Sequence, residues 1–440
     1  MKLLPPTILL AALATGAAAA APVAPLPVVP IRHFGFPGPD RPAQMWSALH
    51  AGSNGRIYIG LCTHGDAATF HEFDPETGKM RLLANLTELA GERGRGVWTT
   101  GKIHVQMQEL DGWIYFGALC EDNGPPAVDF SSYGGVHWYR AELATGRVEQ
   151  LGRITRYWGL LGQTLDPQRR LIHGLAEDGR LYRYHLDDNW TEELGRVDDW
   201  DICRTIFADD AGNVYGSWSG GRVWKLEAAT GRILDLEFLR VPVVPQSRSM
   251  ANPMIDRRNQ WRFIEWDPVD RVAYGIVGGS NQLFRFDPRA GREGTITQLA
   301  EMCAPPFRGG DPFNVPPATL AMALSSGERK IYYLPVLEGD FDYGAVQLDA
   351  GRPSGTDAAE PPSLSFLVTY DLKTGERRDV GLLRADDRRL AYGMGGARVD
   401  RRGRLWFVGA FAETDAARVA RPGSGRHPYS MGLGCYDPAH

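Results

Sequence analysis

A unit repeated seven times along the 440-residue chain constrains the fold more than any other feature of the sequence. Each copy starts with a polar residue and a glycine and continues as a short Ile-, Val-, Tyr- or Trp-rich run. After a loop come a second aromatic run and a further turn. The copies centre on Asn54–Gly60, Asp111–Gly117, Leu171–Gly174, Gly212–Gly216, Val272–Gly275, Lys330–Tyr333 and Gly403–Gly409. Short β-branched and aromatic runs between turn residues predict β-strands.

Seven four-stranded units of roughly 40–70 residues predict an all-β fold, a single seven-bladed β-propeller. The seventh copy ends after its third strand, which leaves its blade one strand short. Ile31–Phe36, near the N-terminus, is the expected outer strand of that blade. A ring closed in this way by an N-terminal strand has no exposed sheet edge.

Residues 1–21 precede the repeats and have the pattern of a secretory signal peptide. Lys2 is followed by a short apolar run and an alanine-rich segment suited to cleavage. An N-terminal membrane anchor is the alternative, although the run is short and contains Pro5 and Pro6. We therefore expect one propeller domain over residues 22–440, exported to the periplasm or secreted.

Charge and composition narrow the partners of that domain. The chain has 48 Lys and Arg residues against 53 Asp and Glu residues, a net charge of -5, which argues against nucleic-acid binding. No later segment is long and apolar enough to span a membrane, and we expect a monomer. Five cysteines without a C-x-x-C pair exclude a zinc ribbon, and similar repeat positions make a Cys62–Cys120 disulfide a hypothesis.

One register of the repeat gathers cationic and titratable residues on the innermost strands. Eight residues before the position that aligns with the glycine of the polar turn, the copies carry Ser47, His104, Leu161, Arg204, Arg262, Thr319 and Gly395. In a propeller, side chains near the start of the innermost strand face the upper mouth of the central channel. Such residues can be polar groups satisfied by channel water. Two arginines and a histidine in one ring favour an anion-binding site instead.

Further candidates are expected at the same mouth. His173, Tyr215 and Tyr274 share a register that we place at the end of the second strand, just below the upper loops, unless they only pack between blades. His137 follows a long loop that starts at Cys120, and we expect it to enter the third strand near His104. Tyr157 and the adjacent Trp158 lie on the connection into the third blade, where they could stack on a sugar or belong to the core.

The chemistry of this set points to acidic sugars. Two arginines would neutralise a substrate carboxylate, and His or Tyr side chains would exchange protons at neutral pH. Neutralising a uronate carboxylate acidifies the adjacent C–H, so a base can remove that proton while the leaving sugar departs by β-elimination. The set is poor in carboxylates, which argues against an ordinary glycosidase with two flanking carboxyl groups.

Blade two also resembles a known family. Lys102-Ile103-His104, the run Asp111–Gly117 and the segment Gly134–Tyr139 are similar to seven-bladed propeller polysaccharide lyases, the ulvan lyases and rhamnose–glucuronate lyases above all. The resemblance implies a lyase acting on a uronate-containing polysaccharide, with His104 as the first of two histidines and His137 as the second. For the tyrosine that follows in the family, Tyr157, Tyr182 and Tyr215 compete, and Arg204 and Arg262 compete for its arginine.

We therefore expect a polysaccharide lyase in which Arg204 and Arg262 hold the carboxylate while His104, with His137 or a tyrosine, handles the proton. The predicted catalytic residues are His104, His137, His173 and Arg204, and the predicted substrate-binding residues are Arg262, Tyr157, Tyr215 and Tyr274. No cofactor is required by this chemistry, although His104 and His137 could hold a divalent metal such as Ca or Zn. The alternatives are a noncatalytic glycan-binding propeller and a glycoside hydrolase acting on a sugar–uronate linkage.

Overall fold

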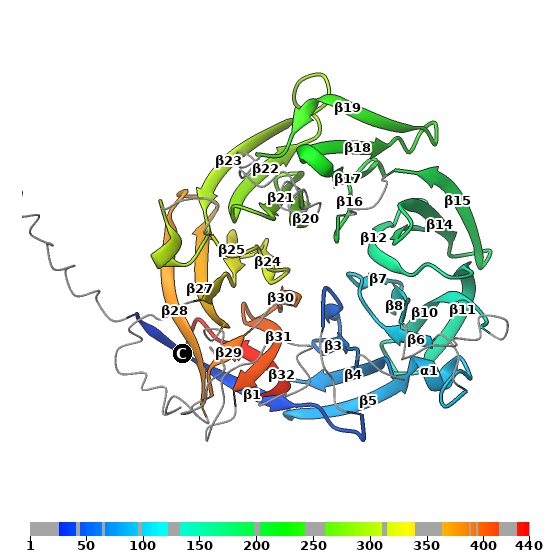
Figure 1. Ribbon diagram of the computed structural model, residues 1–440, viewed down its shortest axis with the longest axis horizontal. Helices are drawn as coiled ribbons and strands as arrows, with labels where there is room; N and C mark the ends of the chain where they lie inside the picture. The colour runs from blue at the N-terminus through cyan, green and yellow to red at the C-terminus, as the bar shows by residue number, and fades with distance from the viewer. Residues whose placement is uncertain are drawn as a thin grey trace, which may run out of the picture.

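The computed structural model describes residues 26–40, 45–63, 67–95, 99–121, 133–197, 203–242, 260–309, 315–338, 363–386, 389–392, 395–412 and 429–439. Within those ranges the only α-helix is α1 (Leu86–Leu89), and almost all regular structure is β-strand. The sheets are arranged around a common axis as in a β-propeller (Figure 1). None of the described helices has the length and apolar character needed to cross a membrane.

Five separate four-stranded sheets form the blades that we name A to E. Blade A contains β2 (Leu49–Ala51), β3 (Ile57–Gly60), β4 (Thr69–Asp74) and β5 (Lys79–Asn85). Blade B contains β7 (Gln108–Leu110), β8 (Trp113–Gly117), β10 (Val136–Glu142) and β11 (Val148–Thr155). Blade C contains β12 (Leu160–Asp166), β13 (Leu171–Ala176), β14 (Arg180–His185) and β15 (Trp190–Arg196). Blade D contains β16 (Phe207–Ala208), β17 (Val214–Trp218), β18 (Arg222–Leu226) and β19 (Ile233–Arg240). Blade E contains β20 (Trp261–Asp267), β21 (Val272–Val277), β22 (Gln282–Asp287) and β23 (Thr295–Glu301).

The sixth and seventh repeats share one ten-stranded sheet. Along its main path the order is β24 (Met322–Ser325), β25 (Lys330–Tyr333), β27 (Ser363–Asp371), β28 (Arg377–Ala385), β1 (Val28–Gly35), β32 (Tyr429–Tyr436), β31 (Leu405–Ala412) and β29 (Ala391–Tyr392). Two short strands lie off this path, β26 (Val336–Glu338) beside β27 and β30 (Ala397–Val399) beside β31.

The predicted seven separate blades are therefore corrected to five separate blades and one joined sheet. Strand β1 causes the joining because its two halves pair with different neighbours. Val28–Ile31 pair in parallel with β28, and Arg32–Gly35 pair antiparallel with β32. A strand of eight residues is long enough to offer hydrogen-bonding groups to both edges.

The recurring glycine at the end of the second strand makes room for an aromatic ring. A Cβ added at Gly216 would lie 2.1 Å from Trp224 Cζ2, and one added at Gly275 would lie 2.4 Å from Phe284 Cζ. Both rings are buried, on the third strands of blades D and E. The core is thus built from aromatic side chains packed against glycine backbone, which explains the aromatic-glycine pattern of the repeat.

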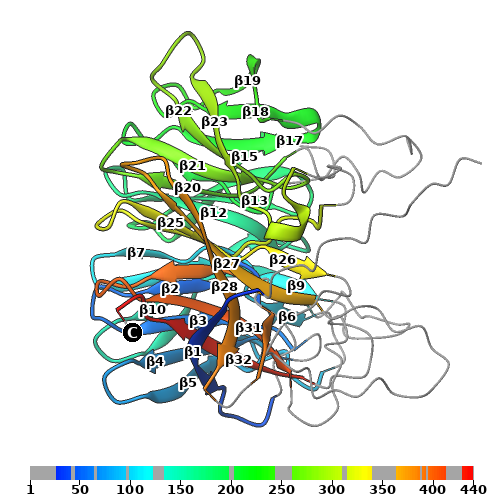
Figure 2. The same cartoon turned by 90° about the vertical axis from the view of Figure 1, so that its left-hand side faces the viewer.

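The ring has two distinct faces. We call the face that carries the connections into the inner strands the upper face, and the face that carries the turns between inner and second strands the lower face. The short ribbon of β6 (Thr99–Lys102) and β9 (Leu119–Glu121) lies on the same side of the ring as β26 (Figure 2). The β6–β9 ribbon lies at the upper face, because β6 leads into inner strand β7, and β26 therefore lies at the upper face as well.

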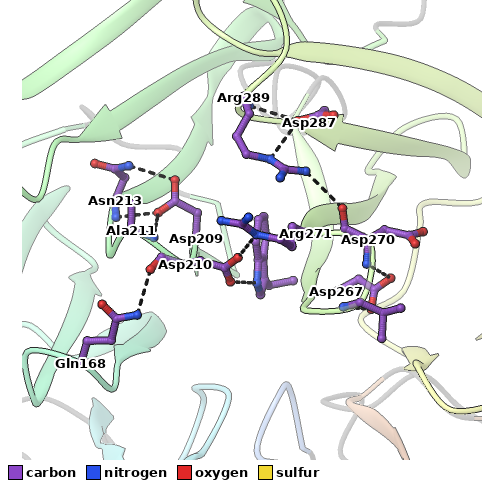
Figure 3. A network of polar contacts seen from close by, with 12 residues as sticks. Gln168, Asp209, Asp210, Ala211, Asn213, Asp267, Asp270, Arg271, Asp287 and Arg289 are labelled. Carbon is purple, nitrogen blue, oxygen red and sulfur yellow. Dashed lines mark hydrogen bonds and ion pairs between the residues drawn. The ribbon is translucent and has the colours of Figure 1, made fainter.

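The lower face is braced by arginines that reach from one blade to the preceding one. Arg271 binds the Asp210 carboxylate, and Arg329 binds Asp267 and Asp270, with 2.6 Å from its Nη1 to Asp267 Oδ2. The aspartates also accept backbone N–H groups of their own turns, as Figure 3 shows for Asp209 and Asp267. These contacts fix the lower ends of neighbouring blades to each other.

Each of the five cysteines is buried, and no disulfide joins any two of them. The hypothesis of a Cys62–Cys120 disulfide is therefore wrong. The Cys120 thiol lies 2.6 Å from the Tyr157 carbonyl oxygen, on the connection into blade C. That contact occupies the thiol in a tertiary hydrogen bond.

Candidate functional site

A series of backbone contacts links the residues of the predicted register to one another around the upper face. Ser47 N–H donates to the His104 carbonyl at 3.0 Å, and His104 Nδ1 lies 2.9 Å from the Leu161 carbonyl oxygen. A Cβ added at Gly162, the next residue, would lie 3.2 Å from the Arg204 carbonyl oxygen. The residues that share one offset from the polar turn are therefore neighbours in space from blade A to blade D.

The same series of contacts continues to Arg262. Thr205, which follows Arg204, accepts the Ile264 N–H on its Oγ1 at 3.1 Å, and its carbonyl accepts the Trp261 indole N–H at 2.8 Å. These contacts hold the start of β20 against the segment before β16. The structure thus brings His104, Arg204 and Arg262 into one group. We name Trp46, Lys102, His104, Arg204 and Arg262 the upper cluster.

His104 is held as a neutral imidazole with a defined tautomer. The side chain is 1% exposed, and burial lowers its pKa well below the ordinary value, with Arg204, Lys102 and Arg262 acting in the same direction. A carbonyl oxygen only accepts, so Nδ1 carries the hydrogen that is donated to Leu161. Nε2 therefore keeps its lone pair, and it has no hydrogen-bond partner among the described residues. A neutral Nε2 of this kind is able to take up a proton.

Trp46 and Lys102 cover this imidazole. The Trp46 ring stacks on His104 with 5.3 Å between centroids, and Lys102 Nζ lies 3.9 Å from the centroid of a Trp46 ring. Lys102 is buried, while Arg204 and Arg262 are half-buried. Three cations, Lys102, Arg204 and Arg262, thus lie close enough to one neutral base to act on its pKa.

His137 lies outside the upper cluster, contrary to the sequence prediction. It occupies the start of β10, the third strand of blade B, and pairs with Arg153 on the outer strand. Burial lowers the His137 pKa, the Gly135 backbone opposes this effect and Arg153 adds to it. The pKa of His137 is therefore set by groups of its own blade, because β8 separates its strand from inner strand β7.

His173, Tyr215 and Tyr274 lie toward the lower turns, which corrects their predicted place beneath the upper loops. Tyr215 donates its hydroxyl to Asp209 at 3.1 Å, and Tyr274 donates to Asp270 at 2.9 Å. Both aspartates belong to turns that lead from inner to second strands. The second strands begin directly after those turns, so residues early in them point away from the upper mouth.

Tyr157 and Trp158 remain on the upper connection into blade C, as predicted from their place in the chain. Tyr157 is half-buried against the core of blades A to C, and Arg156 Cζ lies 5.2 Å from its ring centroid. Trp158 is 51% exposed, with its backbone N–H and carbonyl both bonded to the Thr155 hydroxyl. The exposed indole is therefore the surface aromatic of this pair.

The sequence analysis missed a second group of charged residues on the inner strands. His50 Nε2 of β2 lies 2.9 Å from Glu109 Oε2 of β7, and the Ser53 N–H donates to the same oxygen at 2.9 Å. Burial would raise the pKa of Glu109, but the hydrogen bonds from His50 and Ser53 lower it to about 2. Glu109 stands two residues before Asp111, the first residue of the polar turn, a position that the offset of eight residues did not include.

Glu265 of β20 completes that group. Burial raises its pKa, while Arg398 of β30 and, more weakly, His50 act in the opposite direction. Its Oε2 accepts the Leu324 N–H at 3.3 Å. We name His50, Glu109, Glu265 and Arg398 the lower set. The pKa values of these two carboxyl groups move in opposite directions, and both groups lie outside the set of candidates that the sequence analysis named.

The described residues contain no group of three or more His, Cys, Asp or Glu side chains placed to hold a metal ion. His104 and His137 belong to no such group among the described residues, and His137 lies two strands out from the inner strand of blade B.

Comparisons with known proteins establish the fold only. No family model and no curated protein matches the chain. Among solved structures, RRP9 WD40 repeats align over 92% of this chain and 97% of that one, with 9% identity and a TM-score of 0.53. A chain of the mitotic checkpoint complex aligns over 98% and 99%, with 10% identity and a TM-score of 0.50. The extracellular domain of a one-component system from B. thetaiotaomicron aligns with 13% identity and a TM-score of 0.48, and the match spans 92% of this chain and 39% of that one. The likenesses to the RRP9 WD40 repeats and to the mitotic checkpoint complex chain show the fold alone, a β-propeller.

Proposed function

We propose that this protein binds a uronic-acid-containing glycan at the upper cluster and cleaves it by β-elimination. The observation that carries the proposal is the neutral, unpartnered Nε2 of His104 in a group with three cations. Lys102, Arg204 and Arg262 would bind the uronate carboxylate and so acidify the adjacent C–H. A resident metal is not part of this scheme.

The proposed step conserves protons and electrons. His104 Nε2 removes the proton from the carbon next to the carboxylate, and that electron pair forms a carbon–carbon double bond. The glycosidic C–O bond then breaks, and its electrons stay on the leaving oxygen. The imidazolium returns the proton to that oxygen. Bound carboxylate raises the pKa of His104 toward neutrality, because it offsets the three cations that lower it.

Access to Nε2 involves Trp46. The imidazole is buried beneath the stacked indole, so a sugar that reaches Nε2 does so after Trp46 shifts. Trp158, exposed on the connection into blade C, offers a second surface on which a sugar ring could stack. We also propose that β1 serves as the outer strand of a seventh blade, and that residues 1–21 direct export of the protein.

The first test is ultraviolet absorbance during incubation with ulvan, gum arabic, pectin fragments and glucuronan. Elimination creates a conjugated double bond, so absorbance rises with a true substrate. His104→Gln is expected to lower kcat by about 100- to 10,000-fold, the range of general base catalysis. His137→Gln is the matched control, a histidine of the same blade outside the upper cluster, and should retain wild-type turnover. Equal activity of both variants would exclude His104 as the base.

Arg262→Gln is expected to raise KM for the same substrate and to weaken binding of a uronate oligosaccharide. A change in KM separates carboxylate binding from loss of the base, which acts on kcat. Retained binding of the glycan without turnover in any polysaccharide would indicate a noncatalytic glycan-binding propeller.

The lower set supports a second candidate function, glycoside hydrolysis. Glu109 is ionised at neutral pH and Glu265 is biased toward its protonated form, which is the division of roles between nucleophile or base and general acid. Release of reducing sugar without a rise in ultraviolet absorbance, abolished by Glu265→Gln and retained in His104→Gln, would support this function over elimination.

A further inference from the structure

A groove on the lower face separates two neighbouring turns of the ten-stranded sheet. One wall is the β24–β25 turn with Glu328, and the other is the β30–β31 turn with Arg401 and Gly403. The groove has a volume of about 510 Å³, and Leu324 and Val399 of the adjoining inner strands contribute apolar surface. Figure 1 shows β24 and β30 next to each other near the axis.

The groove exists because a repeated brace is missing there. Arg271 and Arg329 each stand directly before a second strand with left-handed backbone, φ 56° and 58°, and each binds an aspartate of the preceding blade. The β30–β31 turn is one residue longer, and Arg404, directly before β31, pairs with Asp400 of its own turn instead of with the preceding blade. Gly403, with φ 80°, stands before Arg404. A Cβ at Gly403 would lie 2.6 Å from Glu328 Oε1, so glycine lets this carboxylate approach the turn. No guanidinium from position 403 fills the space.

Two side chains of opposite charge, Glu328 and Arg401, have no ion pair with any described residue. Arg402 pairs with Glu76 at 2.7 Å, and Asp400 pairs with Arg404 at 2.7 Å. Glu328, in contrast, accepts only the Tyr332 hydroxyl among the described residues, at 2.9 Å. The exposed Arg401 side chain makes no ion pair or hydrogen bond with the part of the chain that the structure describes. One carboxylate and one guanidinium therefore face the groove from opposite walls.

We propose that this groove binds a free amino acid in its zwitterionic form. The ammonium group pairs with Glu328, the carboxylate pairs with Arg401, and a small aliphatic side chain packs on Leu324 and Val399. The volume lies within the range of roughly 300–1,000 Å³ typical of small-molecule sites. The groove lies on the face opposite the upper cluster, so this inference does not depend on the proposed glycan chemistry.

Calorimetric titration of the wild-type protein with L-leucine, N-acetyl-L-leucine and L-leucinamide tests the two charge contacts separately. N-acetylation removes the ammonium group, and amidation removes the carboxylate. Each change is expected to weaken binding at least tenfold. Glu328→Gln should bind L-leucine and N-acetyl-L-leucine with similar affinity, because its carboxylate is gone. Arg401→Gln should lose the preference for L-leucine over L-leucinamide in the same way.

Arg402→Gln is the matched control, because Arg402 lies beside Arg401 on the β30–β31 turn and its guanidinium is already paired with Glu76 of blade A. The affinity of this variant for L-leucine should stay within twofold of wild type. The three-ligand comparison needs only wild-type protein, so it decides the proposal even where a variant fails to fold. Absence of L-leucine and L-valine binding at millimolar concentrations would overturn it. Equal affinity for all three leucine derivatives, or for acetate alone, would overturn it as well.

Discussion

His104 shows how one side chain acquires a chemical role from its surroundings. Burial and three neighbouring cations keep its imidazole neutral, and a single backbone carbonyl selects the tautomer. The Nε2 atom therefore keeps its lone pair, and the Leu161 carbonyl of another blade holds the ring through Nδ1. Burial also lowers the pKa of His71 to about 4, and burial together with the neighbouring Arg183 lowers the pKa of His173 to about 3.

Those two histidines predict an acid-sensitive fold. Their folded-state pKa values lie below 6.5, so between pH 6.5 and about 4 the unfolded chain binds protons that the folded chain does not. The free energy of unfolding therefore falls as pH falls, by about 1.4 kcal/mol per pH unit for each histidine. Urea unfolding of wild type and His173→Gln at several pH values tests this. The variant should show a slope shallower by about 1.4 kcal/mol per pH unit, and parallel curves would contradict the assignment.

At the scale of the element, the ends of the inner hairpins carry most of the repeated contacts. In the second strands of blades D and E, Gly216 and Gly275 leave room for a buried aromatic ring. Directly before a second strand, Arg271 and Arg329 bind an aspartate of the preceding blade, whereas Arg404 binds an aspartate of its own turn.

Gly275→Ala is expected to destabilise the protein by about 1–3 kcal/mol, because the added methyl group overpacks against Phe284 and the strand backbone. Gly327→Ala provides the control, since a Cβ there meets nothing within 4 Å. Thermal or urea unfolding measures both. Equal stability of the two variants would show that blade E relaxes around the methyl group.

The contribution of each inter-blade arginine to the free energy of unfolding should depend on how deeply its aspartate partner is buried. Asp267 is fully buried beneath Arg329, so Arg329→Gln leaves a buried carboxylate without its cation and is expected to cost about 3 kcal/mol. The Arg170–Asp111 pair is exposed on both sides, so solvent screens it, and Arg170→Gln is expected to cost much less than Arg329→Gln. Urea unfolding of the two variants compares them, and a larger loss for Arg170→Gln would refute the burial argument.

On the scale of the whole molecule, strand β1 links the sixth and seventh repeats. It pairs with β28 through its first half and with β32 through its second half, so two repeats that are far apart from it in sequence depend on it. No other described strand joins two repeats in this way.

Deletion of residues 1–35 should expose the edges of β28 and β32 and cause aggregation or loss of cooperative unfolding. Deletion of residues 1–21, the predicted signal peptide, is the control and should leave unfolding cooperative. Size-exclusion chromatography and thermal unfolding distinguish the two. A monomeric, cooperatively unfolding protein lacking β1 would show that the joined sheet is dispensable.

The sequence by itself determined the β-propeller and the grouping of His104, Arg204 and Arg262. A repeat aligned on its polar turn places equivalent residues at equal distances from the turn, so one offset predicts one level of the ring. Lys102 was also within reach of that reasoning, two residues before His104 in the motif that carried the family resemblance.

Only the tertiary structure decided which end of the second strands holds His173, Tyr215 and Tyr274, how far out His137 lies, and which carboxylates meet near the axis. Strand ends and strand order set these positions, and a shift of a few residues in a predicted boundary moves a side chain from one face of the ring to the other. The joined sheet, the close approach of Glu328 to Gly403 and the pairing of His50 with Glu109 likewise depend on contacts between blades. A local sequence pattern carries no record of such contacts, because they form between residues brought together by the closed ring.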